Sequence, residues 1–258
     1  MRTVQWKFSP MRLFAELNRE ELREAADSLV VLPLGATEQH GPHLATGTDF
    51  FTVQAVARAA AEEAGQSVPI LVAPTLTFGS SDHHFVFGAT LSLSTETYYR
   101  VVRELVESLV KDGFSRIFLI NGHGGNHELA ELVARDVCLH HPVKVGAGSY
   151  WAIAWEALVA SQAHVGRNLP GHAGDFETSV MLALRPDLKP GQLPHRDNPP
   201  DTNPRFRTAP WRHERHGSWK EIGGYTDSPD QASVAKGENF LRIVIAEVAR
   251  AFVDFYRS

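Results

Sequence analysis

Residues 29–34 read Leu-Val-Val-Leu-Pro-Leu and are followed directly by Gly-Ala-Thr-Glu-Gln-His at 35–40. A short apolar run without polar alternation is typical of a strand buried on both faces, as in a parallel sheet. Open parallel sheets bind their ligands beyond the carboxyl ends of the strands. The stretch therefore predicts an α/β fold and places Glu38 and His40 at the edge of the sheet where a ligand would bind.

Strand-like and helix-like patterns alternate through the rest of the chain. Further strands are expected at 70–74, 117–120 and 143–148. Helices with one apolar face are expected at 51–64, 94–113, 126–142 and 177–184, and a last helix carries an apolar stripe over 241–252. This order predicts a mostly parallel central sheet covered by helices on both faces, in one domain over residues 1–258.

The bulk composition excludes some classes of protein. The 258 residues are 43% hydrophobic and 21% charged, which argues against global disorder, and the net charge of -5 gives no support to a nucleic-acid or anionic-membrane partner. Cys138 is the single cysteine, so neither an internal disulfide nor a thiolate metal site is expected, and its place in a helical pattern suggests a small buried residue. No segment approaches a membrane span or a signal peptide, so a cytoplasmic, soluble protein is expected.

The first polar cluster joins Glu38 and His40 to Asp49. Residues two apart in extended backbone point the same way, and Asp49 lies just before a predicted helix, from which it can bend back. Two carboxylates and an imidazole are suitable ligands for zinc or manganese. The alternative is a solvated loop in which Asp49 only caps the helix.

The second cluster is Asn121-Gly-His123-Gly-Gly-Asn126, placed after a strand and before a helix as the first cluster is. Its glycines let the backbone approach a ligand closely, and free amides at the helix start suit an anion. A tight turn alone would also use glycines, but it does not explain a histidine among them.

The third cluster is Gly171-His172-Ala-Gly-Asp175-Phe-Glu177, at the front of a short helix. His172 and Glu177 can reach a site, while Asp175 need not join if it is solvated. The helix dipole favours acidic residues in a first turn, so both carboxylates also have a simpler explanation.

Taken together, the clusters supply too many ligands for one tetrahedral zinc with an open position. Two ions sharing a bridging carboxylate fit better, and Asp49 is the natural bridge. His172 is left over and can shuttle a proton to a leaving nitrogen. The sequence thus predicts a two-metal hydrolase that uses a bound water.

Three strings resemble the creatininase (creatinine amidohydrolase) family in order and spacing along most of the chain: Glu38-Gln-His40-Gly-Pro-His43, Asn121-Gly-His123-Gly-Gly-Asn126 and His172-Ala-Gly-Asp-Phe-Glu177-Thr-Ser179. Residues 88–93 and 236–238 look like weaker landmarks. The resemblance implies a three-layer α/β/α domain, two Zn²⁺ or Mn²⁺ ions per chain, a small-molecule substrate, and a homo-oligomer, often a hexamer built as a trimer of dimers. It also implies the metal ligands Glu38, His40, Asp49, His123 and Glu177, and places the proton shuttle on His172.

The same resemblance suggests contacts to the substrate. Trp151 follows the fourth strand, where creatininase has a tryptophan that packs on the substrate ring, although ordinary core packing explains Trp151 equally well. The candidate substrate contacts are Trp151, Tyr150, Gly124, Gly125 and Ser80. His43, His83 and His84 are expected to line the pocket or the surface rather than to act as a further ligand.

The chain departs from creatinine-hydrolysing members of the family at several places. Gly124 and Gly125 stand where those members have a tyrosine and a metal-associated glutamate, and residues 167–171 lack their tryptophan and acidic residues. The Gly-His-Gly-Gly-Asn form is more like branches that act on formamides, peptides or ring-opening substrates. Creatinine is therefore not the expected substrate.

Three hypotheses follow. The first is hydrolysis of a non-peptide C–N bond in a cyclic amide or formamide, and the second keeps the metals but cleaves a peptide end or a lactone. The third is a metal-stabilised binding or assembly protein, for which His172→Ala would change nothing. Residues 186–229 hold eight of the fifteen prolines and include Trp211, Trp219 and Tyr225. This segment is expected to pack on a neighbouring chain and to help wall the active site.

Overall fold

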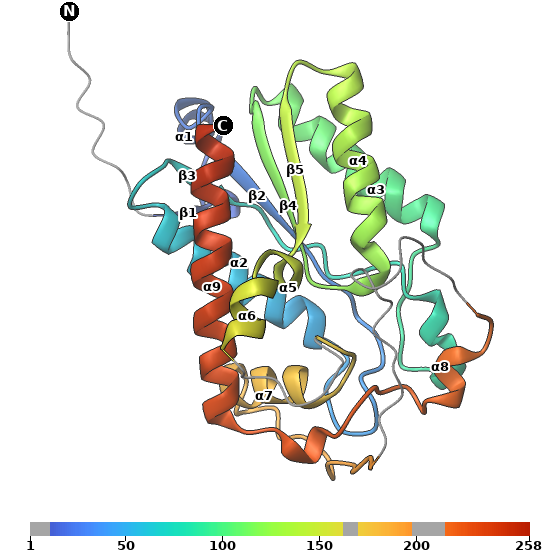
Figure 1. Ribbon diagram of the computed structural model, residues 1–258. Coiled ribbons are helices and arrows are strands. Elements are labelled where there is room, and N and C mark those ends of the chain that lie inside the picture. Colours follow the sequence, from blue (N-terminus) through green and yellow to red (C-terminus); the bar gives the residue numbers. More distant parts are fainter. Residues whose placement is uncertain (1–10, 162–169, 198–214) are drawn as a thin grey trace, which may run out of the picture.

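A five-stranded, fully parallel sheet forms the centre of the computed structural model, which describes residues 11–161, 170–197 and 215–258 (Figure 1). The strand order is β1-β3-β2-β4-β5. The strands are β1 (Arg12–Leu13), β2 (Leu29–Leu34), β3 (Ile70–Val72), β4 (Arg116–Asn121) and β5 (Lys144–Ser149). Every residue of β2 is buried, as its uninterrupted apolar sequence predicts for a central strand.

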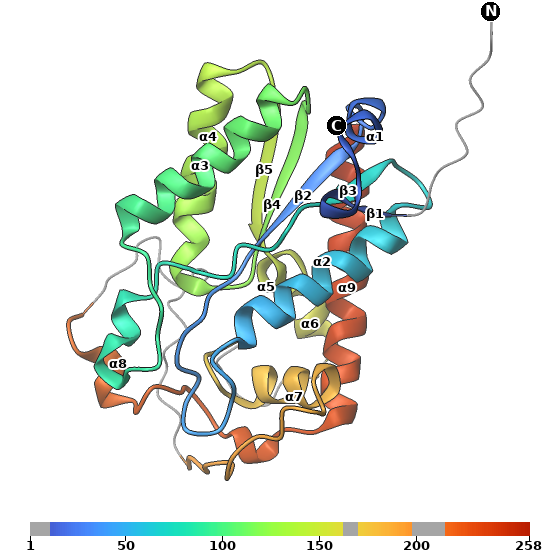
Figure 2. The ribbon, with the colours of Figure 1, turned by 180° about the vertical axis from the view of Figure 1, so that it is seen from behind.

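Helices cover both faces of the sheet (Figures 1 and 2). Leu29 and Val31 face one core with α2 (Thr48–Ala64) and α9 (Val234–Arg257). Val30 and Leu32 face a second core with α3 (Thr95–Lys111) and α4 (His127–His140). The alternation of side chains along β2 thus divides the apolar residues between two cores, and the predicted three-layer α/β/α fold is confirmed.

The remaining elements are short. They are α1 (Arg19–Glu24), α5 (Tyr150–Ile153), α6 (Trp155–Ala160), α7 (Asp175–Leu184), α8 (Ser218–Glu221) and the 3₁₀ turns η1 (Phe14–Glu16), η2 (Asp82–Phe87), η3 (Gly124–Asn126) and η4 (Pro229–Gln231). The edge strand β1 and helix α1 were not predicted. Helix α1 has a capping box between Asn18 and Glu21 and packs Leu22 on the core, but its six residues are too few to show an apolar periodicity.

Helices α7 and α9 pack closely, and α7 carries Glu177. A Cβ atom at Gly237 would lie 1.9 Å from the main-chain oxygen of Ser179, so the two backbones meet at this glycine. Lys236 donates to Asp175 at 2.8 Å, which ties the start of α9 to the start of α7. Asp175 is buried and paired with Lys236, so the solvated state in which it need not join the site is not the one observed.

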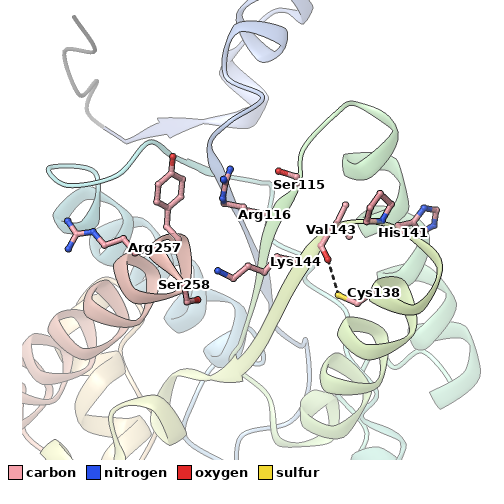
Figure 3. A pocket seen from close by; sticks show the side chains of 10 residues that line it. Ser115, Arg116, Cys138, His141, Val143, Lys144, Arg257 and Ser258 are labelled. Carbon is pink, nitrogen blue, oxygen red and sulfur yellow. Dashed lines mark hydrogen bonds between the residues drawn. The ribbon is translucent and has the colours of Figure 1, made fainter.

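A cavity of about 530 Å³ lies at the amino ends of β4 and β5, the edge opposite Glu38 (Figure 3). Arg116, Lys144 and Cys138 are among the residues that line it. Cys138 is exposed, so the expectation of a buried cysteine was wrong: Val133 and Val137 form the inward stripe of α4, and Cys138 falls outside it.

No helix within the described ranges is long and apolar enough to cross a membrane. The expectations for residues 167–169, and for the part of segment 186–229 that spans 198–214 and includes Trp211, concern residues outside the described part of the chain.

Candidate metal centre

The three polar clusters of the sequence meet beyond the carboxyl ends of the central strands. Glu38 and His40 follow β2, Asp49 lies in the first turn of α2, and His123 follows β4 directly. His172 precedes α7, and Glu177 lies in its first turn. All six side chains are buried, the most exposed at only 7%. This position is the one that the sheet topology predicts for a ligand site.

Asp49 lies between two histidines. His40 Nε2 is 3.1 Å from Asp49 Oδ1 and 3.6 Å from Glu177 Oε2. His123 Nδ1 is 3.1 Å from Asp49 Oδ2 and 3.2 Å from Glu38 Oε1. Each oxygen of Asp49 therefore faces a different histidine–carboxylate pair.

Several buried oxygens at this place lack a donor. Among the residues that the structure describes, none donates a hydrogen bond to either carboxylate oxygen of Glu38 or to Asp49 Oδ2. A buried carboxylate without hydrogen bonds is costly unless a cation compensates it. Two ligands of one tetrahedral zinc, each about 2.0–2.1 Å from the ion, lie roughly 3.3 Å apart. The observed separations are of that size, so the donor set fits divalent metal ions.

Both histidines are oriented by their other ring nitrogen. His40 Nδ1 lies 3.1 Å from the main-chain oxygen of Glu38, and His123 Nε2 lies 3.1 Å from that of Ser80 and 3.2 Å from Ser81 Oγ. A metal-binding histidine usually donates its second ring N–H in this way, which fixes the tautomer. His40 Nε2 and His123 Nδ1 are thus the atoms left to face the centre.

The charges of the cluster shift its pKa values strongly. Burial alone would lower the pKa of His40, but Asp49 and Glu177 outweigh it and raise the pKa to about 10. Burial alone would raise the pKa of Glu38, but His123 and His84 hold it well below its usual value. Burial raises the pKa of Glu177 to about 8, against the opposing charge of His40. Without metal, protons therefore take the place of cations among these carboxylates.

His172 lies beside this cluster and in contact with it. Its Nδ1 is 3.7 Å from Glu38 Oε1, and its ring centroid lies 4.3 Å from those of His40 and His84. Burial, with the neighbouring His40, lowers the pKa of His172 well below its usual value. A neutral imidazole at this place can accept a proton.

Three further side chains at the site were not among the predicted ligands. His84 is buried, and its Nε2 lies 3.3 Å from Glu38 Oε1. Gln39 Nε2 lies 2.8 Å from His84 Nδ1, and the Trp219 ring packs edge-on against His84 and His172. The adjacent histidines at 83 and 84 were a visible signal in the sequence. No sequence pattern indicated that Trp219 would pack on the histidines of its own chain's site.

The candidate substrate contacts lie at different distances from the centre. Tyr150 is buried, and its pKa is raised by burial and by the charges of Glu177 and Asp49, so it borders the cluster. Trp151 packs against the hydrophobic core and edge-on to Tyr150. Gly124 is exposed, and a Cβ atom there would meet nothing within 4 Å.

Gly125 and Ser80 lie against His123. A Cβ atom at Gly125 would lie 2.2 Å from the main-chain oxygen of Ser80 and 2.6 Å from His123 Nε2. The loop therefore fills the space that a side chain at position 125 would need.

A parallel α/β/α fold with buried carboxylates and imidazoles at its carboxyl edge defines a metal-dependent enzyme. A family model described as creatinine amidohydrolase matches residues 15–252. The chain belongs to the creatininase family and is a metal-dependent amidohydrolase of that family.

Two relatives illustrate the breadth of the family. The creatinine amidohydrolase of Pseudomonas putida is 32% identical over 244 residues, which cover 88% of this chain and 89% of that enzyme. The mycofactocin precursor peptide peptidase of Mycolicibacterium smegmatis is 36% identical over 161 residues, which cover only 62% of this chain and 59% of that peptidase.

Solved structures agree with the sequence comparison. A crystal structure of creatinine amidohydrolase superposes with a TM-score of 0.77 at 29% identity, covering 95% of this chain and 98% of the other. A manganese form of creatininase gives a TM-score of 0.76 at 29% identity, covering 95% and 99% of the two chains. A zinc–zinc form of a creatininase mutant gives 0.77 at 29% identity, covering 97% and 100%.

Proposed function

We propose that this chain uses two divalent metal ions, zinc or manganese, to hydrolyse a non-peptide carbon–nitrogen bond in a cyclic amide or a formamide. The observation that carries the proposal is the division of Asp49 between two histidine–carboxylate pairs. The donorless oxygens of Glu38 and Asp49 support it, because they need cations.

His40, Asp49 and Glu177 would hold one ion, and Glu38, Asp49 and His123 the other. When bound, such ions activate a water molecule near neutral pH and polarise the carbonyl of the substrate. The solved creatininases with manganese or with two zinc ions support this assignment. The ordered ring nitrogens of His40 and His123 mean that little reorganisation is needed when the ions bind.

His172 is the proposed catalytic base and acid. Its pKa is lowered, so the ring is neutral and can take a proton from the attacking water. It then delivers that proton to the leaving nitrogen. Gln39 and Trp219 contact the ring and hold it beside Glu38.

Creatinine is not the proposed substrate. Creatinine-hydrolysing members carry a tyrosine and a glutamate where this chain has Gly124 and Gly125. The tight contacts of Gly125 with Ser80 and His123 leave no space for such a glutamate. A second candidate activity, cleavage of a peptide end, is favoured by the higher identity over the part shared with the mycofactocin peptidase.

The test combines metal analysis with a substrate panel. Purified protein is expected to hold about two zinc or manganese ions per chain and to open a formamide or cyclic amide, with activity lost in chelator and restored by either metal. The panel includes creatinine, formamidopyrimidines, short peptides and lactones. Turnover of peptides alone would favour the second candidate. Fewer than about one tightly held ion per chain would contradict the metal assignment.

We also infer a homo-oligomer, with a hexamer built as a trimer of dimers as the expected form. Three apolar side chains in and just after η2 are more than half exposed: Phe85 at 53%, Val86 at 52% and Leu91 at 60%. Exposed apolar clusters of this kind commonly mark contacts between chains. Sedimentation velocity should give a species larger than the monomer, and a stable, fully active monomer would overturn the inference.

A further inference from the structure

The side chain of Gln39 lies between two buried histidines and contacts both. Gln39 separates the proposed ligands Glu38 and His40 in the chain, and only 5% of it is exposed. Its hydrogen bonds reach His84 and His172, which approach the site from different segments. The main-chain oxygen of Gln39 and the two hydrogens of its side-chain amide together limit where the two rings can carry hydrogens.

The orientation of the amide is fixed first. The main-chain N–H of Gly41 donates to Gln39 Oε1 at 2.9 Å, so the other end of the amide is the nitrogen. Gln39 Nε2 then lies 2.8 Å from His84 Nδ1, 3.1 Å from His172 Nε2 and 3.1 Å from the oxygen of Gly224. An amide nitrogen has only two hydrogens, so it cannot donate to all three groups.

The main-chain oxygen of Gln39 shows which nitrogen of the His172 ring carries the hydrogen. This oxygen lies 3.0 Å from His172 Nε2 and can only accept a hydrogen bond. His172 Nε2 therefore carries a hydrogen and donates it to that oxygen. In the neutral ring, Nδ1 then has a free lone pair.

The two amide hydrogens now have two acceptors left. One goes to the oxygen of Gly224 and the other to His84 Nδ1, which must be unprotonated to accept it. The hydrogen of His84 is then on Nε2, which lies 3.3 Å from Glu38 Oε1 but does not form a hydrogen bond with it in the present geometry. In the opposite tautomer of His172, two lone pairs would face each other at 3.0 Å, so only the first arrangement satisfies every group.

We propose that Gln39 is a positioning residue that sets two tautomers, with the hydrogen on Nε2 in both rings. Its main-chain oxygen sets that of His172, and its side-chain amide sets that of His84. His172 then presents the bare Nδ1 to the proposed centre, and His84 directs an N–H at Glu38. The catalytic meaning of this arrangement rests on the proposed function.

Two observations describe the surroundings of His172 Nδ1 and of the Gln39 amide. This atom and Glu38 Oε1 are 3.7 Å apart, too far for a direct hydrogen bond, and both are acceptors. A water molecule that lies to one side of this pair can donate one hydrogen to each of the two atoms. The position of the Gln39 amide is itself confined, because a Cβ atom at Gly224 would lie 2.8 Å from Gln39 Oε1.

The direct test is ¹⁵N NMR of the histidine side chains in the zinc-loaded protein. Long-range ¹H–¹⁵N spectra distinguish a protonated from a bare ring nitrogen, and His172→Asn and His84→Asn assign the two rings. We expect a protonated Nε2 and a bare Nδ1 for both. A hydrogen on Nδ1 of either ring would overturn the proposal, and this result needs neither a known substrate nor a Gln39 variant.

Substitutions at Gln39 test the cause. In Gln39→Glu an acceptor replaces the amide nitrogen, so His84 should gain a hydrogen on Nδ1. Gln39→Leu should lower kcat by about 10–100-fold while KM and zinc content stay within about twofold. Gln54→Leu, at a half-buried glutamine of α2, is the matched control and should leave kcat, KM and zinc content unchanged.

The outcomes separate this proposal from the proposed function. An unchanged His84 spectrum in Gln39→Glu would show that Gln39 does not set the tautomer. The assigned tautomers in a protein that turns over no amide or formamide would uphold the role of Gln39 and contradict the proposed activity. Turnover of an amide or formamide by a protein with the opposite tautomers would support the proposed activity and contradict the role of Gln39.

Discussion

At the scale of single residues, the centre depends on side chains that have no substitute nearby. Among the described carboxylates of the centre, Asp49 is the one whose two oxygens each face a different histidine. Glu38, His123 and Glu177 each border one of the two proposed ion positions. Equally conservative changes should therefore have unequal effects on metal content.

Asp49→Asn is expected to remove both ions or leave one loosely held. The substitution keeps the volume but removes a charge that, at an effective dielectric constant of about 20, is worth roughly 4 kcal/mol for each unit charge at about 4 Å. The metal-free variant should still fold, because asparagine keeps the volume of the side chain at the second residue of α2. Elemental analysis beside a thermal melt checks this. Glu38→Gln is the comparison and should lose mainly one ion, whereas two retained ions in Asp49→Asn would disprove the bridge.

Gly125→Ala should damage the centre although it adds a single methyl group. That methyl would collide with the oxygen of Ser80 and the ring of His123. Overpacking of this kind costs about 1–3 kcal/mol, and displacement of His123 should lower metal content. Gly124→Ala is the matched control, since its methyl group meets nothing and should leave both the melting temperature and the metal content unchanged. Equal effects of the two variants would refute the packing argument.

The residue-level predictions from sequence worked where a side chain directly follows a strand or begins a helix. Glu38, His40 and His123 lie where the carboxyl ends of β2 and β4 put them, and the structure gathers them with Asp49 and Glu177. Their role as ligands remains a prediction. The contacts of Gln39, His84 and Trp219 could not be foreseen, because they depend on how an irregular 3₁₀ turn and a distant short helix fold over the site.

At the scale of elements, α7 and α9 hold one side of the centre. Helix α7 supplies Glu177, and its position depends on close packing against the start of α9. Most strands and long helices were predicted within a few residues, since their apolar periodicity is uninterrupted. Strand β1 was missed because a two-residue edge strand carries no such pattern.

Gly237→Ala is expected to destabilise the protein, although alanine is normally favoured over glycine in a helix by about 0.5–1 kcal/mol. The new methyl group would lie 1.9 Å from the backbone oxygen of Ser179 and force α7 away from α9. We expect a loss of at least about 1–3 kcal/mol and a weaker hold on metal through Glu177. Urea unfolding measures the change. Glu238→Ala, at the exposed neighbour, should stay within about 0.5 kcal/mol, and a stabilised Gly237→Ala would contradict the close approach.

Asp227, which contacts the start of α7, should make stability depend on pH. Burial raises its pKa to about 6, although the N–H of Asp175 donates to it at 2.7 Å. An acid with a raised folded-state pKa favours folding while protonated, so this contribution is lost between about pH 4 and pH 6 as pH rises. The loss is on the order of 3 kcal/mol. An asparagine side chain at the same position does not titrate.

The stability of the Asp227→Asn variant relative to the wild type should therefore increase as pH rises. Melts of both metal-free proteins at pH 4.5 and pH 7 measure the difference, which should grow by several degrees. A difference that is the same at both pH values would show that the Asp227 carboxyl is not perturbed. Asp112→Asn, at an exposed position, serves as the control and should show no such growth.

At the scale of the whole molecule, the metals should contribute to global stability, because their proposed ligands come from both halves of the chain. Ions present at about a thousand times their Kd add about 4 kcal/mol. Removal by chelator should thus lower Tm by roughly 8–16 °C. Scanning calorimetry before and after restoring zinc or manganese checks this. An unchanged Tm together with complete metal loss would mean that the centre contributes nothing to the fold.

The packing of α9 over α2 and α7 has a consequence for the order in which the chain is synthesised. Glu38, His40, Asp49 and His123 are translated before Glu177, and α9, which packs over α2 and α7, is translated after all of these residues. A nascent chain can pair β2 with β4 and cover Leu29 and Val31 with α2, yet the residues that α9 contributes to this core are missing until residues 234–257 are translated. During that interval the incomplete core is a target for chaperones or for association with other nascent chains. Metal capture is therefore expected to be a post-translational event.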